Sequence, residues 1–319
     1  MDEGIHPDAR AVLERRRSLG LTPVHEQGRH RVRLLERLTS RIGDGGPAVA
    51  ATTDLTVPGP GGRIPVRAYR PEGEGPYPTV VYLHGGGFVF GSIASHDALC
   101  RTLANASDSV VLSVDYRLAP EHPFPAAVED AYAATAWAAA NPEKLRSTGD
   151  LSVVGDSAGG TLAAVVALVA AERAAGVERD GVTVAADVVP DIDRQALLYP
   201  SVGVAERQAS VEAYDGLVLT RADLEWFHDC YYGDDATQRH PYADPIHADD
   251  LSGVAPATVL TAGFDPLRDG GRAYAARLAE AGVDTDFVEY EDMIHGFATD
   301  LARIERAREA VERVAAGLP

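Results

Sequence analysis

Residues 151–162 constrain the fold of this chain more than any other stretch. They begin with an apolar run that predicts a short buried strand, continue as Gly155-Asp156-Ser157-Ala158-Gly159, and lead into a segment rich in Ala, Val and Leu that predicts a helix. The flanking glycines allow two backbone segments to pass where a Cβ would clash, so the turn can hold the serine hydroxyl clear of the chain. The free N–H groups and positive end of the helix then lie beside that hydroxyl.

The same five residues also occur in ordinary turns, so the pentapeptide alone does not decide its role. A strand before it and a helix after it are the context in which a Gly-x-Ser-x-Gly turn presents a nucleophile. We therefore predict that Ser157 is a catalytic nucleophile. Such a serine requires an oxyanion-binding loop earlier in the chain, and an acid and a base later in it.

Short apolar runs alternate with helical segments along most of the chain. Strands are predicted at residues 79–83, 109–114, 151–154, 196–199, 258–261 and 285–290. Helices are predicted at residues 96–106, 126–140, 157–175, 267–281 and 298–316. Continuous apolar strands separated by helices predict a mainly parallel sheet covered on both faces. Residues 54–57 and 63–69 alternate around a Pro/Gly-rich turn, which predicts an antiparallel pair at the sheet edge.

Three regions depart from this alternation. Residues 1–45 are predicted to form N-terminal cap helices, and residues 176–195 to form an acidic surface excursion. Residues 201–248 are rich in aromatic and acidic side chains and too long for a simple loop, which predicts a helical cap insertion that forms part of a lid. The remaining segments, 46–200 and 249–319, are predicted to form the α/β core.

Charge and cysteine content narrow the classes of partner and the compartment. A net charge of −19 over 319 residues argues against nucleic acids and anionic membranes as partners. Cys100 and Cys230 are too few for a disulfide framework, which predicts free thiols in a reducing compartment. The N-terminus lacks the segments of a signal peptide, and the apolar run at 162–171 is too short to span a bilayer. We expect a cytoplasmic protein without stable membrane insertion.

A second glycine-rich motif, His84-Gly85-Gly86-Gly87-Phe88, directly follows the strand predicted at residues 79–83. Consecutive glycines can turn their N–H groups toward one point, where they stabilise the anionic oxygen of a tetrahedral intermediate. A phosphate-binding loop is the alternative, but it would require a lysine or a G-x-G-x-x-G spacing, and this motif has neither. The motif therefore predicts an oxyanion-binding loop.

These two motifs give the chain a recognisable family. It resembles the hormone-sensitive-lipase group of α/β-hydrolases, bacterial carboxylesterases with an HGGGF loop and a GDSAGG elbow, and residues 115–127 (DYRLAPEHPFPAA) match a third segment of that group. The resemblance implies an α/β-hydrolase fold, with a mainly parallel eight-stranded sheet, helices on both faces and a helical cap. It also implies that the oxyanion donors are the backbone N–H groups of Gly85, Gly86 and Ala158.

Two residues are predicted to complete a catalytic triad with Ser157. Asp265 follows the strand predicted at 258–261 in a D-P-L-x-D pattern, of which the first Asp is the triad acid in the family. Asp269 is the competing acid, but its place one turn into a helix is more typical of a cap or an ion pair. His295 lies in an H-G-F sequence after a predicted strand. It is the one histidine that both follows the serine and the acid in the chain and lies in a loop after a strand.

The resemblance implies a carboxylic-ester hydrolase for short- to medium-chain acyl esters, with a small-molecule ester as partner, no metal or cofactor, and a homodimer as a plausible assembly. Candidates for substrate binding are Phe88, Tyr199, Trp226 and Phe227. An amidase, lactonase or carbamate hydrolase on the same triad stays open, as does a non-catalytic ligand receptor of the same fold. The chain lacks the acidic residue that often follows Pro200 in the family, which leaves the acyl-chain preference open.

Overall fold

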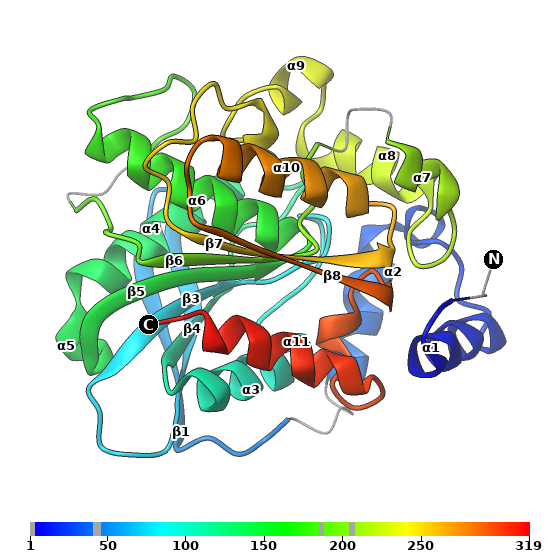
Figure 1. The fold of residues 1–319 in the computed structure, drawn as a ribbon, viewed down its shortest axis with the longest axis horizontal. Coiled ribbons are helices and arrows are strands. Elements are labelled where there is room, and N and C mark those ends of the chain that lie inside the picture. The colour runs from blue at the N-terminus through cyan, green and yellow to red at the C-terminus, as the bar shows by residue number, and fades with distance from the viewer. Residues whose placement is uncertain (1–3, 41–45, 185–187, 204–207) are drawn as a thin grey trace.

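The computed structural model describes residues 4–40, 46–184, 188–203 and 208–319. Parts of three predicted regions lie outside the described residues, namely 1–3 and 41–45 of the N-terminal cap region, 185–187 of the acidic excursion and 204–207 of the cap insertion. The described chain forms three layers, with one sheet between two layers of helices (Figure 1).

The described strands form a single eight-stranded sheet in the order β1-β2-β4-β3-β5-β6-β7-β8. Their bounds are β1 Ala51–Gly59, β2 Gly62–Arg70, β3 Tyr77–Leu83, β4 Val110–Val114, β5 Ser147–Asp156, β6 Arg194–Leu198, β7 Ala257–Phe264 and β8 Thr285–Ile294. Strand β2 is antiparallel to both β1 and β4, and all other neighbours are parallel. The prediction of a mainly parallel sheet with an antiparallel edge is confirmed.

Helices cover both faces of this sheet. The longer ones are α3 Asp97–Ser107, α4 Ala126–Ala140, α6 Ala158–Ala174, α10 Arg268–Glu280 and α11 Glu305–Ala316. The shorter ones within the core are α5 Pro142–Leu145 and the 3-10 helices η1 Pro245–His247 and η2 Phe297–Thr299. In Figure 1, α4, α6 and α10 lie on one face and α3 and α11 on the other. Each face has its own apolar core, because strands that are buried on both sides carry apolar residues in continuous runs.

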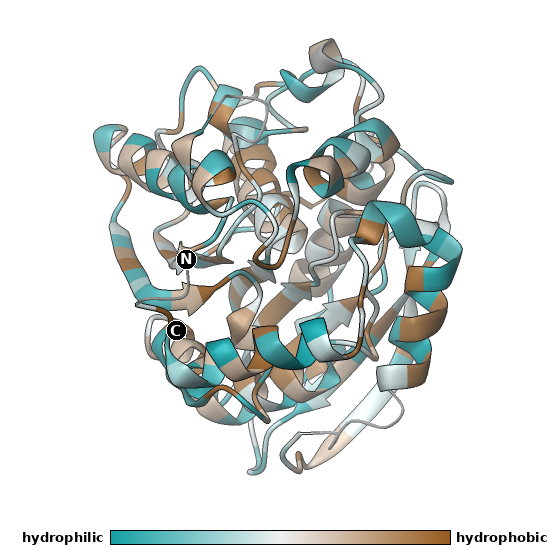
Figure 2. Cartoon of the chain, turned by 90° about the vertical axis from the view of Figure 1, so that its right-hand side faces the viewer, coloured by the Kyte–Doolittle hydropathy of each residue, from teal (hydrophilic) through white to brown (hydrophobic). Residues whose placement is uncertain are grey.

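A further group of helices lies beside the carboxyl ends of the strands, at the right of Figure 1. These helices are α1 Pro7–Ser18, α2 Val24–Ser40, α7 Ala209–Ala213 and α8 Arg221–Tyr231, and the short α9 Asp235–Gln238 lies nearby. Helix α2 is broken at Gly28, whose φ of 70° and ψ of 155° are not helical. Figure 2 looks onto this side of the molecule, where hydrophobic and hydrophilic residues alternate along the helices, as expected for elements that are buried on one side only.

Two sequence expectations differ from the structure near the end of the chain. The strand predicted at 285–290 extends to Ile294, directly before His295. The single helix predicted at 298–316 divides into η2 and α11. The division allows Phe297 to pack against Tyr199 below the His295 loop, whereas α11 packs against α3. Among the described helices, none is both long enough and apolar enough to cross a bilayer.

Candidate active site

Ser157 lies in the sharp turn between β5 and α6. Its φ of 53° is positive, which costs a residue with a Cβ on the order of 1–3 kcal/mol and persists only where the surroundings enforce it. Two glycines make the turn possible, because a Cβ on Gly155 would lie 2.1 Å from the carbonyl oxygen of Gly159, and a Cβ on Gly159 would lie 2.0 Å from that of Leu83. The Ser157 N–H also donates to Leu198 O at 2.9 Å, which ties the turn to β6.

The structure brings Ser157, His295 and Asp265 together. His295 Nε2 lies 3.0 Å from Ser157 Oγ, and His295 Nδ1 lies 2.7 Å from Asp265 Oδ2. Asp265 is fully buried, and its other oxygen accepts the N–H of Leu267 at 2.8 Å. This second bond fixes the carboxylate, so the imidazole can only donate to it from Nδ1 while Nε2 faces the serine. The arrangement is the one that nucleophilic catalysis by serine requires.

The competing acid, Asp269, is engaged elsewhere. One of its oxygens accepts the N–H of Ser210 at 2.9 Å and the other accepts Nε of Arg268 at 3.1 Å. Asp265 and His295 meet because they follow the adjacent parallel strands β7 and β8, whose carboxyl ends open at the same edge of the sheet. Asp269 lies one turn further on, within α10, where it serves the contact between α10 and α7.

The predicted oxyanion donors need one correction. The N–H of Gly85 donates to Asp156 Oδ1 at 2.8 Å, so it is not available to a substrate oxygen. The N–H groups of Gly86 and Gly87 have no acceptor among the described residues, and both glycines have positive φ values, 122° and 59°. Ala158 is the first residue of α6, where N–H groups have no partner within the helix. The structure therefore leaves the N–H groups of Gly86, Gly87 and Ala158 without an acceptor among the described residues, whereas that of Gly85 is already bonded.

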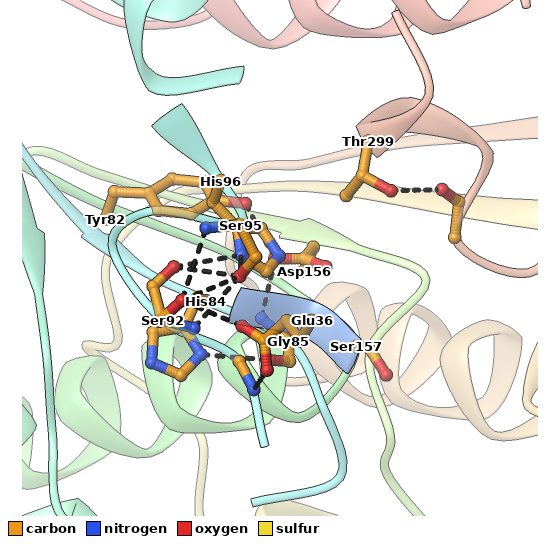
Figure 3. A network of polar contacts seen from close by, with 12 residues as sticks. Glu36, Tyr82, His84, Gly85, Ser92, Ser95, His96, Asp156, Ser157 and Thr299 are labelled. Atoms are coloured by element: carbon orange, nitrogen blue, oxygen red, sulfur yellow. Dashed lines mark hydrogen bonds and ion pairs between the residues drawn. The ribbon is translucent and has the colours of Figure 1, made fainter. Parts of the chain in front are cut away.

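Asp156 is the centre of a buried polar network that sequence reasoning missed (Figure 3). In addition to the Gly85 N–H, it accepts the hydroxyl of Tyr82 at 2.6 Å, and it forms an ion pair with Nε2 of His96 at 3.3 Å. Nδ1 of His96 lies 2.9 Å from Ser95 Oγ. The residue before the nucleophile thus fixes the first peptide of the oxyanion loop, a role that only side-chain geometry reveals.

The network continues to α2, outside the sheet. Ser95 Oγ donates to Ser92 O at 2.9 Å, and Ser92 Oγ donates to Glu36 Oε1 at 2.8 Å (Figure 3). The second Glu36 oxygen accepts the N–H of Gly91 at 3.0 Å. A single carboxylate on α2 is therefore bonded to the segment that follows the oxyanion loop.

Burial and charge shift the pKa values in this network. Burial by itself would lower the pKa of His96, but the neighbouring Asp156 carboxylate outweighs it and holds the pKa above its ordinary value. Burial would raise the pKa of Asp156, but His96, Tyr82 and the Gly85 N–H together hold it below its ordinary value. For His84, burial, followed by repulsion from His96, lowers the pKa to about 4. The contact between His96 and Asp156 thus favours the charged form of both groups, whereas His84 beside them is neutral at pH 7.

A cavity of about 390 Å³ opens above Ser157 and His295. Of the four predicted substrate-binding residues, Phe88 and Phe227 line it. Tyr199 and Trp226 are not among the residues that line it, and their role in substrate binding stays a prediction. Tyr199 is fully buried with its ring 5.0 Å from that of His295, so it supports the imidazole, and Trp226 contacts the ring of Phe227 at 5.3 Å between centroids without lining the cavity.

The upper wall of the cavity comes from α1, α2 and α8 and from the segment between α7 and α8. Its apolar members are Val12, Val24, Val218, Leu219, Leu224 and Phe227. Helices α2 and α8 are joined there, because the N–H of His25 donates to Asp223 Oδ1 at 2.8 Å. The wall above the nucleophile is thus built largely from apolar side chains.

No group of three His, Cys, Asp or Glu side chains within the described chain is arranged to hold a metal ion. Cys100 and Cys230 are both free thiols, the first buried and the second half-buried.

Comparison with known proteins agrees with this geometry. Residues 80–299 match a family described as alpha/beta hydrolase fold. LipI, an esterase of Mycobacterium tuberculosis, is 36% identical over 98% of this chain and 87% of LipI. LipN, a carboxylic ester hydrolase of the same organism, is 46% identical over 77% of this chain, and the chain spans only 64% of the length of LipN.

Solved structures show the same similarity in three dimensions. A hyperthermophilic esterase from Pyrobaculum calidifontis superposes with a TM-score of 0.88 at 41% identity, covering 98% of this chain and 97% of that chain. Together the fold, the serine elbow and these matches define a protein of the α/β-hydrolase class. The chain belongs to the alpha/beta hydrolase fold family, in its hormone-sensitive-lipase-like group.

Proposed function

We propose that this protein is a serine carboxylesterase that hydrolyses short- to medium-chain acyl esters through Ser157, His295 and Asp265. The observation that carries the proposal is the continuous contact from Asp265 Oδ2 to His295 Nδ1 at 2.7 Å and from His295 Nε2 to Ser157 Oγ at 3.0 Å. The esterases among its relatives support the same class of reaction.

The mechanism follows from these contacts. Ser157 Oγ attacks the acyl carbonyl carbon while His295 Nε2 takes the hydroxyl proton, and Asp265 stabilises the charged imidazole. The N–H groups of Gly86, Gly87 and Ala158 stabilise the anionic oxygen of the intermediate. His295 then gives its proton to the leaving alcohol. Water, activated by the same imidazole, attacks the acyl-enzyme, releases the carboxylic acid and restores Ser157. The proposed reaction uses only groups of the chain and water.

The cavity supports the proposed range of substrates. Its volume of about 390 Å³ lies near the lower end of the range for small-molecule sites, which runs from roughly 300 to 1,000 Å³. Apolar residues from α1, α2 and α8 contribute to its wall. We infer that residues 1–45 and 201–248 act as a cap over a core formed by 46–200 and 249–319. Contacts of the substrate with this cap would set the acyl-chain preference.

The direct test is hydrolysis of p-nitrophenyl butyrate by the wild type and by Ser157→Ala. We expect turnover by the wild type and a loss of at least about 10⁴-fold in kcat in the variant, since triad members act as a unit. The control is Ser252→Ala, which changes an exposed serine that does not line the cavity and should keep full activity. Turnover that persists in Ser157→Ala would assign the chemistry to another residue.

A second assay separates this proposal from its alternatives. Rates on a matched butyryl ester and butyryl amide distinguish an esterase from an amidase, because the same triad serves both reactions. We expect the ester to react faster. An inactive wild type that still binds an ester analogue would instead indicate a ligand receptor. Cytoplasmic location, a homodimer, and the exclusion of nucleic acids and stable membrane insertion stay predictions from the sequence.

A further inference from the structure

Arg16 is the one lysine or arginine among the described residues that line the cavity above Ser157. It lies on α1, the helix that contributes Val12 to the same wall. Its guanidinium group has no hydrogen bond and no carboxylate within 4.0 Å among the described residues. A partly buried cation without a partner in a substrate cavity is costly, because burial removes water without supplying a counter-charge.

The carboxylates around the cavity are all occupied by other donors. Glu36 accepts the Gly91 N–H at 3.0 Å and the Ser92 hydroxyl at 2.8 Å. Asp300 pairs with Arg303 at 3.0 Å, and Asp156 pairs with His96 at 3.3 Å. Each carboxylate of the cavity wall therefore has hydrogen-bond or ion-pair partners, whereas the Arg16 guanidinium has none among the described residues.

The carboxylate that acts on Arg16 from farther away is Asp223 on α8. Its oxygens accept the His25 N–H at 2.8 Å and the Thr220 N–H at 2.9 Å, and it forms no ion pair with the Arg16 guanidinium within 4.0 Å. Burial lowers the pKa of Arg16, and the attraction of Asp223 offsets only part of that effect. The side chain remains a cation at pH 7, since an arginine stays protonated in proteins.

A second polar group of the wall also lacks a partner. Gln238, at the end of α9, is 1% exposed, lines the cavity, and its Oε1 accepts no hydrogen bond from the described residues. Gln238 Oε1 is an acceptor and needs a donor, whereas the Arg16 guanidinium is a donor that an ester of hydrocarbon groups would leave without a hydrogen bond. A site with buried polar groups favours a ligand that pairs with them.

We propose that Arg16 binds a carboxylate on the substrate, so that the preferred esters carry an anionic group in addition to the ester bond. This inference rests on the proposed esterase function and specifies its substrate class. Arginine binds carboxylates through two parallel hydrogen bonds, which gives both affinity and orientation. The net charge of −19 opposes anionic ligands at long range, but salt screens that repulsion over about 8 Å at physiological ionic strength, whereas a contact inside the cavity is screened less.

The test compares two matched substrate pairs at physiological ionic strength. The first pair is monoethyl adipate and ethyl hexanoate, which places the carboxylate on the acyl part. The second pair is 4-acetoxybenzoate and 4-tolyl acetate, which places it on the leaving group. For each pair, the ratio of kcat/KM for the anionic ester to that for the neutral ester is measured in the wild type and in Arg16 variants, so differences in intrinsic reactivity cancel between variants.

In Arg16→Gln we expect this ratio to fall by about tenfold or more in at least one pair, with the change mainly in KM. Arg16→Lys, which keeps the charge, should retain much of the ratio. Arg15→Gln is the matched control, because Arg15 is the preceding residue of α1 and is exposed, so it should leave the ratios unchanged.

Two results would overturn the inference. Ratios that stay the same in both pairs would show that Arg16 does not contact the substrate. An equal loss on all four esters would show that it acts only on the structure of α1. Either result leaves the esterase proposal intact, because that proposal fails only if the wild type hydrolyses no ester or if Ser157→Ala remains active.

Discussion

The floor and the roof of the cavity are built in different ways. The floor, defined here as the oxyanion loop with Ser157, Asp265 and His295, lies at the carboxyl ends of β3, β5, β7 and β8. Its carboxylates Asp156 and Asp265 are almost fully buried, and each accepts at least two hydrogen bonds or ion pairs. The roof is defined as α1, α2, α7 and α8, and its least buried helix is α2. Helix α2 has no buried residue, and its Leu34 and Leu38 are 57% and 48% exposed.

The two regions are nevertheless connected at a few points. Arg33 on α2 donates from Nε to Val89 O at 2.8 Å and from Nη2 to Ala119 O at 2.8 Å, and Glu36 accepts bonds from the loop after the oxyanion motif. Backbone turns and buried hydrogen bonds therefore determine the chemistry of the floor. We expect side chains on the roof helices to determine what the cavity accepts. Substitutions in the floor should change kcat, and substitutions in the roof should change KM and selectivity.

The largest effect should come from the buried acid of the floor. Asp265→Asn removes the negative charge that stabilises the His295 imidazolium and selects its tautomer, so we expect kcat to fall by about 10⁴-fold. Asp269→Asn is the matched control four residues later, and it should leave kcat within a few-fold of wild type while weakening the contact to Ser210. Both are measured with p-nitrophenyl butyrate. Equal losses in the two variants would contradict the assignment of Asp265.

The buried histidine of the floor should make stability depend on pH. The pKa of His84 is lowered to about 4 in the folded state, so between pH 6.5 and 4 the unfolded chain binds a proton that the folded chain does not. The free energy of unfolding is therefore undiminished by His84 above pH 6.5. It falls by about 3 kcal/mol as the pH falls toward 4.

Denaturant unfolding of the wild type and of His84→Phe across this range tests the pH prediction. The aromatic replacement keeps the stacking on Tyr116, whose ring lies 4.3 Å away. The wild type should lose more of its free energy of unfolding than the variant as the pH falls. The raised pKa of His96 acts in the opposite sense. Its stabilisation of the fold is present at low pH and is lost as the pH rises through the pKa of His96 in the folded state. Parallel curves for the two proteins would show that His84 does not titrate as proposed.

The smallest effect should come from the roof. Phe227 lines the cavity and lies against Gly87, where a Cβ would meet its ring at 2.4 Å. Phe227→Ala removes part of the apolar wall, so we expect KM for p-nitrophenyl butyrate to rise by roughly tenfold with little change in kcat. Trp226→Ala changes the neighbouring side chain, which does not line the cavity, and should leave KM almost unaltered. If Phe227→Ala lowered kcat and left KM unchanged, the ring would act on the chemical step and not on substrate binding.

Local patterns in the sequence predict much of the floor. Ser157, Asp265 and His295 each follow a predicted strand, and parallel strands place such residues at one edge of a sheet. The identity of the oxyanion donors could not be predicted with the same certainty, because it depends on the Asp156 side chain, which reaches back to the Gly85 N–H. The orientation of Tyr199 could not be predicted for a related reason. A position next to a strand end does not tell whether the ring lines the cavity or packs against the His295 imidazole.

The sequence alone determined the order of strands and helices, the strained serine turn and the choice of Asp265 over Asp269, because each depends on glycine spacing, apolar periodicity or chain order. Only the tertiary structure decided which N–H groups are free, which aromatic residues line the cavity, and that Arg16 has no hydrogen-bond partner within the described part of the chain. These depend on contacts between segments far apart in the chain, such as α1 with the catalytic loops. Burial and hydrogen-bond pairing are properties of such contacts, and a linear pattern does not contain them.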